Sequence, residues 1–348
     1  MVRSAFRDLQ WRRRRIVIAV LGTSLVFAIT LVLTGLSHGF EVEAKRLVDD
    51  LHADTWAVRQ GAAGPFLGQV PFQEGALDEL LAVGGVSGAT PMVFGRKSIG
   101  SDPPADVNIF GSTGRGLTTL EVDEGRRVVA PGEVVLSTTL GYGLGDEIVL
   151  SGKRFEVVGR IDGWTAIAGV PNALVSLADA QEVVFAGLPV VSAIAVDGHP
   201  QATPDGIDFI DNARAKDDLL RSLGKAKSAI SLVASLLWIV AAAIVGSVIY
   251  VSTLERARDF AVFKATGTSN VSIVGDLAVQ AGVLSTAAAA VGALVATVIA
   301  PKFPLPVVIP GSAYLLLPVA AVLVGVVASA FGLRRAVTID PALAFGSA

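Results

Sequence analysis

The sequence predicts an α-helical integral membrane protein with four transmembrane helices and an α+β extracytoplasmic domain inserted between helices one and two. Three observations predict this fold class. The chain of 348 residues has only 17% charged residues and a mean hydropathy of +0.62. Its apolar residues gather in four charge-free stretches of roughly 20 residues, each long enough to cross a hydrocarbon core of about 30 Å. Between the first two stretches, the pattern changes to short β-rich runs separated by glycine and proline.

The four apolar stretches set the expected organisation. The first runs from Ile16 to Leu36, and no small-x-small cleavage motif follows it, so we expect an uncleaved span rather than a signal peptide. The expected segments are 1–15 cytoplasmic interfacial helix, 16–37 transmembrane helix 1, 38–227 extracytoplasmic α+β domain with helical stalk ends, 228–252 transmembrane helix 2, 253–271 cytoplasmic loop, 272–300 transmembrane helix 3, 301–312 extracytoplasmic loop, 313–333 transmembrane helix 4 and 334–348 cytoplasmic tail.

Basic residues near the ends of the spans predict the orientation, because Lys and Arg in short connections stay on the cytoplasmic side. Those expected on one side are Arg3, Arg7, Arg12–Arg15, Arg256, Arg258, Lys264, Arg334 and Arg335. The short connection between spans three and four has only Lys302. We therefore expect a multi-pass protein of the bacterial inner or plasma membrane with both termini in the cytoplasm.

Helical periodicity continues outside the spans. At the N-terminus, Val2, Ala5, Phe6 and Leu9 recur at helical spacing, which favours an interfacial helix over a disordered tail. Beyond span one and before span two, apolar residues recur at the same spacing: Phe40, Ala44, Leu47, Val48, Leu51, Leu219, Leu220 and Leu223. The spans are expected to extend outward as a helical stalk; separate juxtamembrane helices without contact are the alternative.

The inserted segment predicts strands and a few short helices. The expected strands include Thr55–Arg59, Val134–Ser137, Glu147–Leu150, Phe155–Arg160 and Ala193–Val196, and helical signals occur at Glu74–Val83 and Leu177–Phe185. Ile148–Ile161 is expected to form a hairpin that turns through Ser151, Gly152 and Lys153.

Span three and the connection after it have distinctive compositions. Small residues at Ser285, Ala289, Gly292 and Ala293 favour close helix packing within the membrane, either in this chain or across a dimer. The connection from Pro301 to Ser312 contains four prolines, so we expect it to be extended without an added helix.

Composition and motifs argue against several function classes. The net charge of -3 leaves no basic surface for nucleic acid, and without cysteine the chain has neither disulfides nor thiolate sites. His38, His52 and His199 are too scattered for a zinc site. Ser222-x-x-Lys225 matches a nucleophile spacing without any partner motif, and no P-loop is present. We expect no catalytic, cofactor-binding or metal site on this chain.

The most specific segment is the loop between spans two and three, Leu254–Gly267. Its charged residues open a short helix, its aromatic residues supply apolar knobs, and Gly267 suits a helix C-cap. An exposed helix of this kind suits docking into a groove on a partner, and a solvated interfacial helix is the alternative. The candidate contact residues are Glu255, Arg256, Arg258, Asp259, Phe260, Phe263, Lys264 and Gly267.

This loop resembles the signature of FtsX-like and MacB-like ABC transporter permeases, Glu-Arg-x-Arg-Asp-x-x-Val-x-Lys-Ala-x-Gly over 255–267. The tail around Asp340-Pro341-Ala342 is similar to the family's C-terminal pattern, and residues 130–161 resemble the MacB-type extracytoplasmic core domain. The order of one span, a large outer domain and three spans is also similar. Phe260 departs from the usual Ile but keeps the apolar knob, while residues 85–130 match loosely.

The resemblance implies the permease subunit of an ABC complex. Its coupling loop 253–271 would contact a separate ABC ATP-binding subunit, which would hold the ATP and Mg, and permeases would pair as a homodimer or as two different chains. The implied function is export, extrusion or mechanotransmission, with an extracytoplasmic adaptor, lipoprotein or hydrolase as a further partner. Regulation of a cell-wall hydrolase and import of a small solute such as an amino acid are the alternatives. The spans have no charged pair, which argues against a polar solute pathway.

Overall fold

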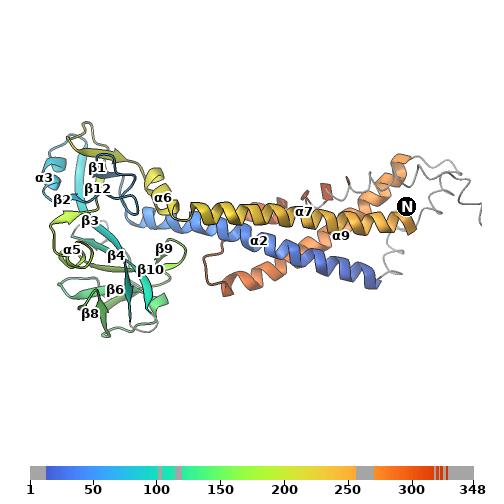
Figure 1. Cartoon of the computed structure of the whole chain (residues 1–348), viewed down its shortest axis with the longest axis horizontal. Helices are drawn as coiled ribbons and strands as arrows, with labels where there is room; N and C mark the ends of the chain where they lie inside the picture. Colours follow the sequence, from blue (N-terminus) through green and yellow to red (C-terminus); the bar gives the residue numbers. More distant parts are fainter. Residues whose placement is uncertain are drawn as a thin grey trace, which may run out of the picture. The chain divides into compact units, whose positions relative to one another are not determined.

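The computed structural model describes residues 13–100, 104–113, 120–255, 270–316, 319–320, 322–323 and 327. The chain divides into two compact units (Figure 1). The first, called here the helical unit, comprises Met1–Gly39, Lys227–Phe303 and Val307–Ala348. The second, called the core domain, comprises Phe40–Ala226 together with Pro304–Pro306.

Long helices dominate the helical unit: α2 (Arg13–Asp50), α7 (Gly224–Glu255) and α9 (Asn270–Ile299). Within the described residues, three helices are long and apolar enough to cross a membrane, over Val17–Asp50, Gly224–Val248 and Gly282–Lys302, and they overlap the first three predicted spans. Many large apolar side chains of α7 are exposed, among them Leu232, Leu236 and Ile239. For the predicted fourth span, residues 311–316 are helical and most of the remainder lies outside the described residues.

Close packing between α2 and α9 confirms the prediction drawn from the small residues of span three. A β-carbon built on Gly292 would lie 2.8 Å from the carbonyl oxygen of Ser24 and 2.9 Å from the β-carbon of Phe27. Ser285 and Ala289 on α9 are buried as well. The small-residue face of α9 is therefore occupied by α2 of the same chain at this point.

The connection after α9 begins with a short 3-10 turn, η2 (Ala300–Lys302), which the expectation of an extended connection without an added helix did not include; residues 303–310 form neither helix nor strand. Pro301 lies inside this turn because the first positions of a helix need no backbone N–H donor. The next residues follow α2, where the N–H of Val308 donates to the carbonyl of Gly35 at 3.0 Å. Helical structure resumes at residue 311.

The described part of the core domain contains an eleven-stranded sheet and a separate two-stranded sheet of β2 (Phe72–Gln73) and β11 (Val190–Val191). The strands of the large sheet are β1 (Thr55–Arg59), β3 (Val86–Ile99), β4 (Ala105–Ser112), β5 (Glu124–Gly125), β6 (Glu133–Ser137), β7 (Glu147–Leu150), β8 (Lys153–Ile161), β9 (Thr165–Ala166), β10 (Val170–Ser176), β12 (Ala193–Gly198) and β13 (Ile207–Ile210). Their order is β13-β1-β12-β3-β4-β10-β6-β8-β5. The pairs β4–β10 and β6–β8 are parallel, and the other pairs are antiparallel.

The predicted hairpin is confirmed. Strands β7 and β8 pair from Leu150↔Lys153 outward, and the two residues between them, Ser151 and Gly152, both have positive φ. This is the type I′ geometry that matches the twist of antiparallel strands. Strand β7 also meets β3 through Ile99↔Leu150, so β3, β4, β10, β6, β8 and β7 form a closed ring.

Both faces of the large sheet are buried, and successive residues of a strand alternate between two apolar clusters. On one face, Phe94 and Phe110 pack with residues of α2 and of α6 (Asn212–Arg221). On the other, Val93 and Ile109 pack with α3 (Ala76–Leu81) and α5 (Leu177–Phe185). Figure 1 shows α3 and α5 beside these strands. Helix α5 has the predicted bounds, whereas α3 is shorter than the predicted 74–83.

The two arms of the predicted stalk differ. Helix α2 continues without interruption from Arg13 to Asp50. The second arm is interrupted, because α6 ends at Arg221 and α7 begins at Gly224, with a turn between them. Glycine has low helix propensity, which suits a break at this position. The expectation of one continuous second arm was therefore wrong.

Candidate functional site

Of the predicted ATPase-coupling residues, Glu255 is the last residue of α7, and the others come between α7 and α9 in the sequence. Helix α7 ends at Glu255, and α9 begins at Asn270. The other candidates lie outside the described residues: Arg256, Arg258, Asp259, Phe260, Phe263, Lys264 and Gly267. Their role as an ATPase contact stays a prediction.

The outer part of α2 is part of the hydrophobic core of the core domain. Phe40, Ala44, Leu47, Val48 and Leu51 are all buried. The last four join one apolar cluster with Trp56, Phe66, Phe94, Phe110 and Trp164, whose rings contact one another at centroid separations of 5.1 to 6.5 Å. Helix α2 (Arg13–Asp50) therefore contains both the apolar stretch 16–36 and residues of this cluster.

Glu43 is the charged residue on this buried face of α2, with only 8% of its surface exposed. Its carboxylate accepts a hydrogen bond of 2.6 Å from the hydroxyl of Thr165 and bonds of 2.9 Å from the N–H groups of Ala168 and Gly169. Burial raises the pKa of Glu43, although these three hydrogen bonds oppose the shift. The carboxylate therefore holds the hairpin loop between β9 and β10 against α2.

The loop held by Glu43 has an unusual backbone. Its three residues, Ile167, Ala168 and Gly169, have φ values of 56°, 65° and 79°. For residues other than glycine, the left-handed region costs about 1–2 kcal/mol each, and a β-branched residue such as isoleucine rarely adopts it. Residue-specific contacts must therefore maintain this conformation.

The ends of the same loop are fastened to the sheet. Asn108 of β4 is fully buried, and its side-chain amide donates to the side chain of Asn172 at 2.9 Å. The same amide donates at 3.4 Å to the carbonyls of Ala166 and Val170, which flank the loop. The sheet fixes the base of the hairpin, while Glu43 contacts its tip.

A second buried carboxylate fastens α6 to the core domain. Asp218 is fully buried and accepts 2.8 Å hydrogen bonds from the N–H groups of Phe66 and Gly68. A β-carbon on Gly64 or Gly68 would lie within 2.8 Å of this side chain, so glycine is needed at both positions. Both helices that connect the core domain to apolar spans thus carry a carboxylate bound by a loop of that domain.

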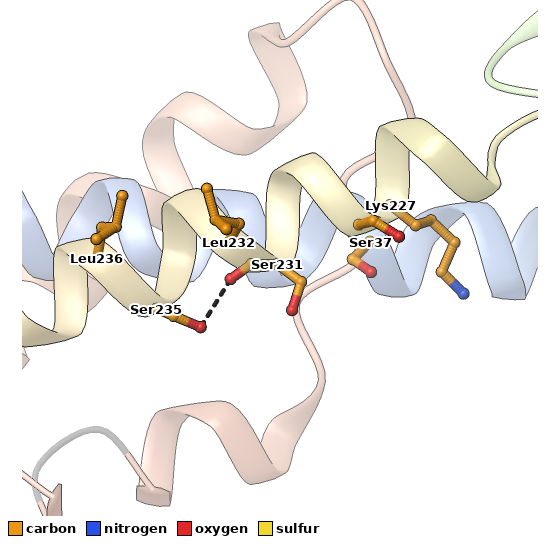
Figure 2. A pocket seen from close by; sticks show the side chains of 7 residues that line it. Ser37, Lys227, Ser231, Leu232, Ser235 and Leu236 are labelled. Carbon is orange, nitrogen blue, oxygen red and sulfur yellow. Dashed lines mark hydrogen bonds between the residues drawn. The ribbon is translucent and has the colours of Figure 1, made fainter.

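A groove of about 660 Å³ lies in the helical unit (Figure 2). Ser37 of α2 and residues of α7 line it: Lys227, Ser228, Ser231, Leu232, Ser235 and Leu236. Every lining side chain is exposed or half-buried, and the hydroxyl of Ser235 donates to the carbonyl of Ser231 at 2.8 Å. The groove offers hydroxyl groups and one ammonium group.

The residues considered for chemistry belong to different structural elements. Ser222 follows the end of α6, and Lys225 belongs to α7. His38 belongs to α2, whereas His52 follows α2 and its Nδ1 contacts the carbonyl of Asp50 at 2.7 Å. In the described part of the chain, no group of three or more His, Asp and Glu side chains could hold a metal ion.

Sequence reasoning missed Glu43 and Asp218, although a signal was present. Glu43 lies three residues after Phe40 and four before Leu47, which places it on the apolar stripe. Asp218 lies three residues after Ala215 and directly before Leu219, both of which are buried. A charge on a predicted buried stripe indicates a carboxylate that needs partners.

Two family descriptions cover this chain. Residues 16–208 match the MacB-like periplasmic core domain, and residues 231–341 match the FtsX-like permease C-terminal family. Uncharacterized ABC transporter permease Mb2592 of Mycobacterium bovis is 47% identical over 99% of both chains. This chain belongs to the FtsX-like and MacB-like ABC transporter permease family. It is accordingly a membrane protein with an α/β extracytoplasmic domain, and membership implies an ATP-binding subunit as its partner.

The permease is also similar to a further curated relative and to two solved structures. Uncharacterized ABC transporter permease Rv0072 of Mycobacterium tuberculosis is 46% identical over 99% of both chains. Among solved structures, the periplasmic region of MacB from Actinobacillus actinomycetemcomitans has a TM-score of 0.36 and 12% identity, covering 49% of the permease and 94% of that chain. The extracellular domain of the noncanonic ABC-type transporter YknZ has a TM-score of 0.34 and 14% identity, covering 45% of the permease and 100% of that chain.

Proposed function

We propose that this permease transmits the energy of ATP hydrolysis, performed by a separate ATP-binding subunit, to its extracytoplasmic core domain. The observation that carries this proposal is the continuity of α2. One helix contains an apolar span and, through Ala44, Leu47, Val48 and Leu51, part of the core-domain hydrophobic core. A displacement of this helix cannot leave the core domain unaffected, because packed interiors resist continuous deformation.

The contact with the ATP-binding subunit is assigned to the loop 253–271. Phe260 and Phe263 would be the apolar anchors, and Arg256 and Arg258 would lie at the rim. The bounds of α7 and α9 support this assignment, because they leave a short segment between two apolar helices. ATP and Mg would be bound by the partner, with no cofactor on this chain. Both termini and this loop would face the cytoplasm.

The movement of the core domain would drive the export or extrusion of an amphiphilic or peptide-like substrate. Regulation of an extracellular cell-wall hydrolase would use the same transmission, with a protein partner in place of a substrate. The permease would act as a homodimer or as a pair with a second permease, and an extracytoplasmic adaptor or lipoprotein would be a further partner.

Co-purification tests the assignment. The tagged permease is isolated from its native membrane, and the amount of ABC ATP-binding subunit retained is compared between wild type, Phe260→Ala and Phe263→Ala. Truncating a buried aromatic anchor costs about 2 kcal/mol or more, which is roughly a thirtyfold loss of affinity. Phe303→Ala, at a partly exposed phenylalanine outside the loop, is the matched control and should retain the subunit. Undiminished retention by both loop variants would contradict the assignment.

A further inference from the structure

We propose that Glu43 is a latch: it holds the β9–β10 loop, residues 167–169, in a strained conformation and releases it when α2 shifts. The inference rests on the proposed function for the force that moves α2. The contact itself is independent of that function. According to this proposal, the side chain of Glu43 is the contact through which a movement of α2 changes the conformation of a loop of the sheet.

Three features make the loop suitable as a two-state element. Its base is fixed to the sheet by Asn108, which donates to the carbonyls of Ala166 and Val170. Its tip is held by a carboxylate on a different element, at Ala168 and Gly169. The backbone between them has three successive positive φ values. Once the tip contact is lost, the strained residues have a lower-energy conformation available.

The contact is also sensitive to small movements. The three hydrogen bonds to Glu43 measure 2.6 to 2.9 Å, so a shift of α2 by about 1 Å takes them beyond hydrogen-bond distance. The segment after α9 meets the same tip, because a β-carbon on Gly169 would lie 3.5 Å from Cδ of Pro306. Two segments that adjoin apolar helices therefore converge on this loop.

A buried carboxylate is a costly way to fasten a loop if fastening is its only role. Glu43 lies in the core domain, beyond the apolar stretch 16–37, and burial raises its pKa despite its hydrogen bonds. For an acid with a raised pKa, stability is greatest below the unfolded value of 4.5 and decreases as pH rises through the folded value. The raised pKa means that the folded domain favours a neutral side chain at position 43. Because glutamine is neutral and of similar shape, Glu43→Gln should leave the domain folded.

The first experiment needs no ATP-binding subunit. Hydrogen exchange of residues 165–170 is measured in the full chain in lipid nanodiscs. Glu43→Gln weakens charge-assisted bonds to the N–H groups of Ala168 and Gly169, and their exchange should accelerate roughly tenfold to a hundredfold. Glu41→Gln, an exposed position on the same helix, should exchange like wild type. Unchanged exchange in Glu43→Gln would overturn the latch.

A second variant tests the strain without disturbing the carboxylate. Ala168→Gly removes the penalty for positive φ at a half-buried position, so the latched loop should become more stable and exchange roughly fivefold more slowly. Exchange as fast as wild type, or faster, would mean that the loop stores no strain, and the proposal would fail.

The third arm adds the ATP-binding subunit. Trapping the complex with ATP and vanadate should change loop exchange in wild type and in Glu41→Gln, whereas Glu43→Gln should exchange fast in both states. If the exchange of the wild-type loop is the same with and without nucleotide, in a complex that hydrolyses ATP, the latch is refuted and the proposed function stands. If no subunit binds wild type, the proposed function fails, and the first two arms decide the latch.

Discussion

Gly292 of α9 faces Phe27 of α2 at a distance that leaves no room for a side chain: a β-carbon on the glycine would lie 2.9 Å from that of the phenylalanine. Phe27 in turn contacts the ring of Trp238 on α7, with centroids 6.4 Å apart. The three long helices are thus joined around one aromatic residue. Packing of this kind is the main stabilising force between helices in a membrane, where water drives no association.

Gly292→Val should loosen this junction. The added side chain would overlap Phe27 and the backbone of Ser24, and overpacking of this kind typically costs about 1–3 kcal/mol. We expect a lower midpoint of thermal unfolding in detergent. Gly275→Val on the same helix is the control, since among the described atoms a β-carbon there meets nothing within 4 Å. Equal midpoints for the two variants would show that the helix contact is not close.

Gly35→Val tests the attachment of the connection after α9. A β-carbon at Gly35 would lie 2.7 Å from Cγ1 of Ile309 and 2.9 Å from Cγ1 of Val307. The substitution should displace this segment and break the hydrogen bond from Val308, with faster exchange of the Val308 amide. Gly22→Val, also on α2, meets nothing within 4 Å and should leave that exchange unchanged. The idea fails if the two variants exchange alike.

Three long apolar helices and one hairpin could be predicted because their signals are local. A charge-free run of about 20 residues and a two-residue turn with glycine each define a structure without reference to the rest of the chain. The strands β3 and β4 were not among those named from the sequence, and each contains glycine, which ordinarily weakens a strand prediction. In the structure, Gly95 and Gly111 make room for α5, since β-carbons there would lie 2.7 Å from Val184 and 2.1 Å from Ala180.

The hydrogen bonds of Glu43 and Asp218 could not be predicted from sequence patterns, because their partners are far away along the chain. The partners of Glu43 are a hydroxyl and two N–H groups more than 120 residues away, and those of Asp218 are N–H groups about 150 residues away. Nothing in the sequence near Ile167 indicates three successive positive φ values. The predicted ATPase-coupling residues, by contrast, came from a continuous motif, and their contact stays a prediction.

Acid should weaken the core domain through Glu133. The hydrogen bond from Arg126, with further bonds from the N–H groups of Val129 and Ala130, lowers the pKa of Glu133 from 4.5 to about 2. A lowered pKa contributes stability above the unfolded value of 4.5, and this contribution is lost as pH falls toward 2. Glu133→Gln should reduce the pH dependence of the unfolding midpoint in this window. An unchanged dependence would show that this pair is not responsible.

Cysteine labelling can establish the orientation, because the natural chain contains no cysteine. Asp205→Cys lies in an exposed loop of the core domain, and a membrane-impermeant maleimide should label it in intact cells. Ser347→Cys, near the C-terminus, should be labelled only after the membrane is disrupted. Labelling of Ser347→Cys in intact cells would reverse the proposed topology.

ATP hydrolysis on the cytoplasmic side is proposed to change the core domain on the other side of the membrane, and hydrogen exchange can detect that change. Hydrogen exchange across residues 40–226 is compared in the complex with its ATP-binding subunit, without nucleotide and after trapping with ATP and vanadate. We predict a nucleotide-dependent change in wild type that is lost in the variant combining Phe260→Ala and Phe263→Ala. Identical exchange in the two wild-type states, while ATP is hydrolysed at a normal rate, would contradict transmission to the core domain.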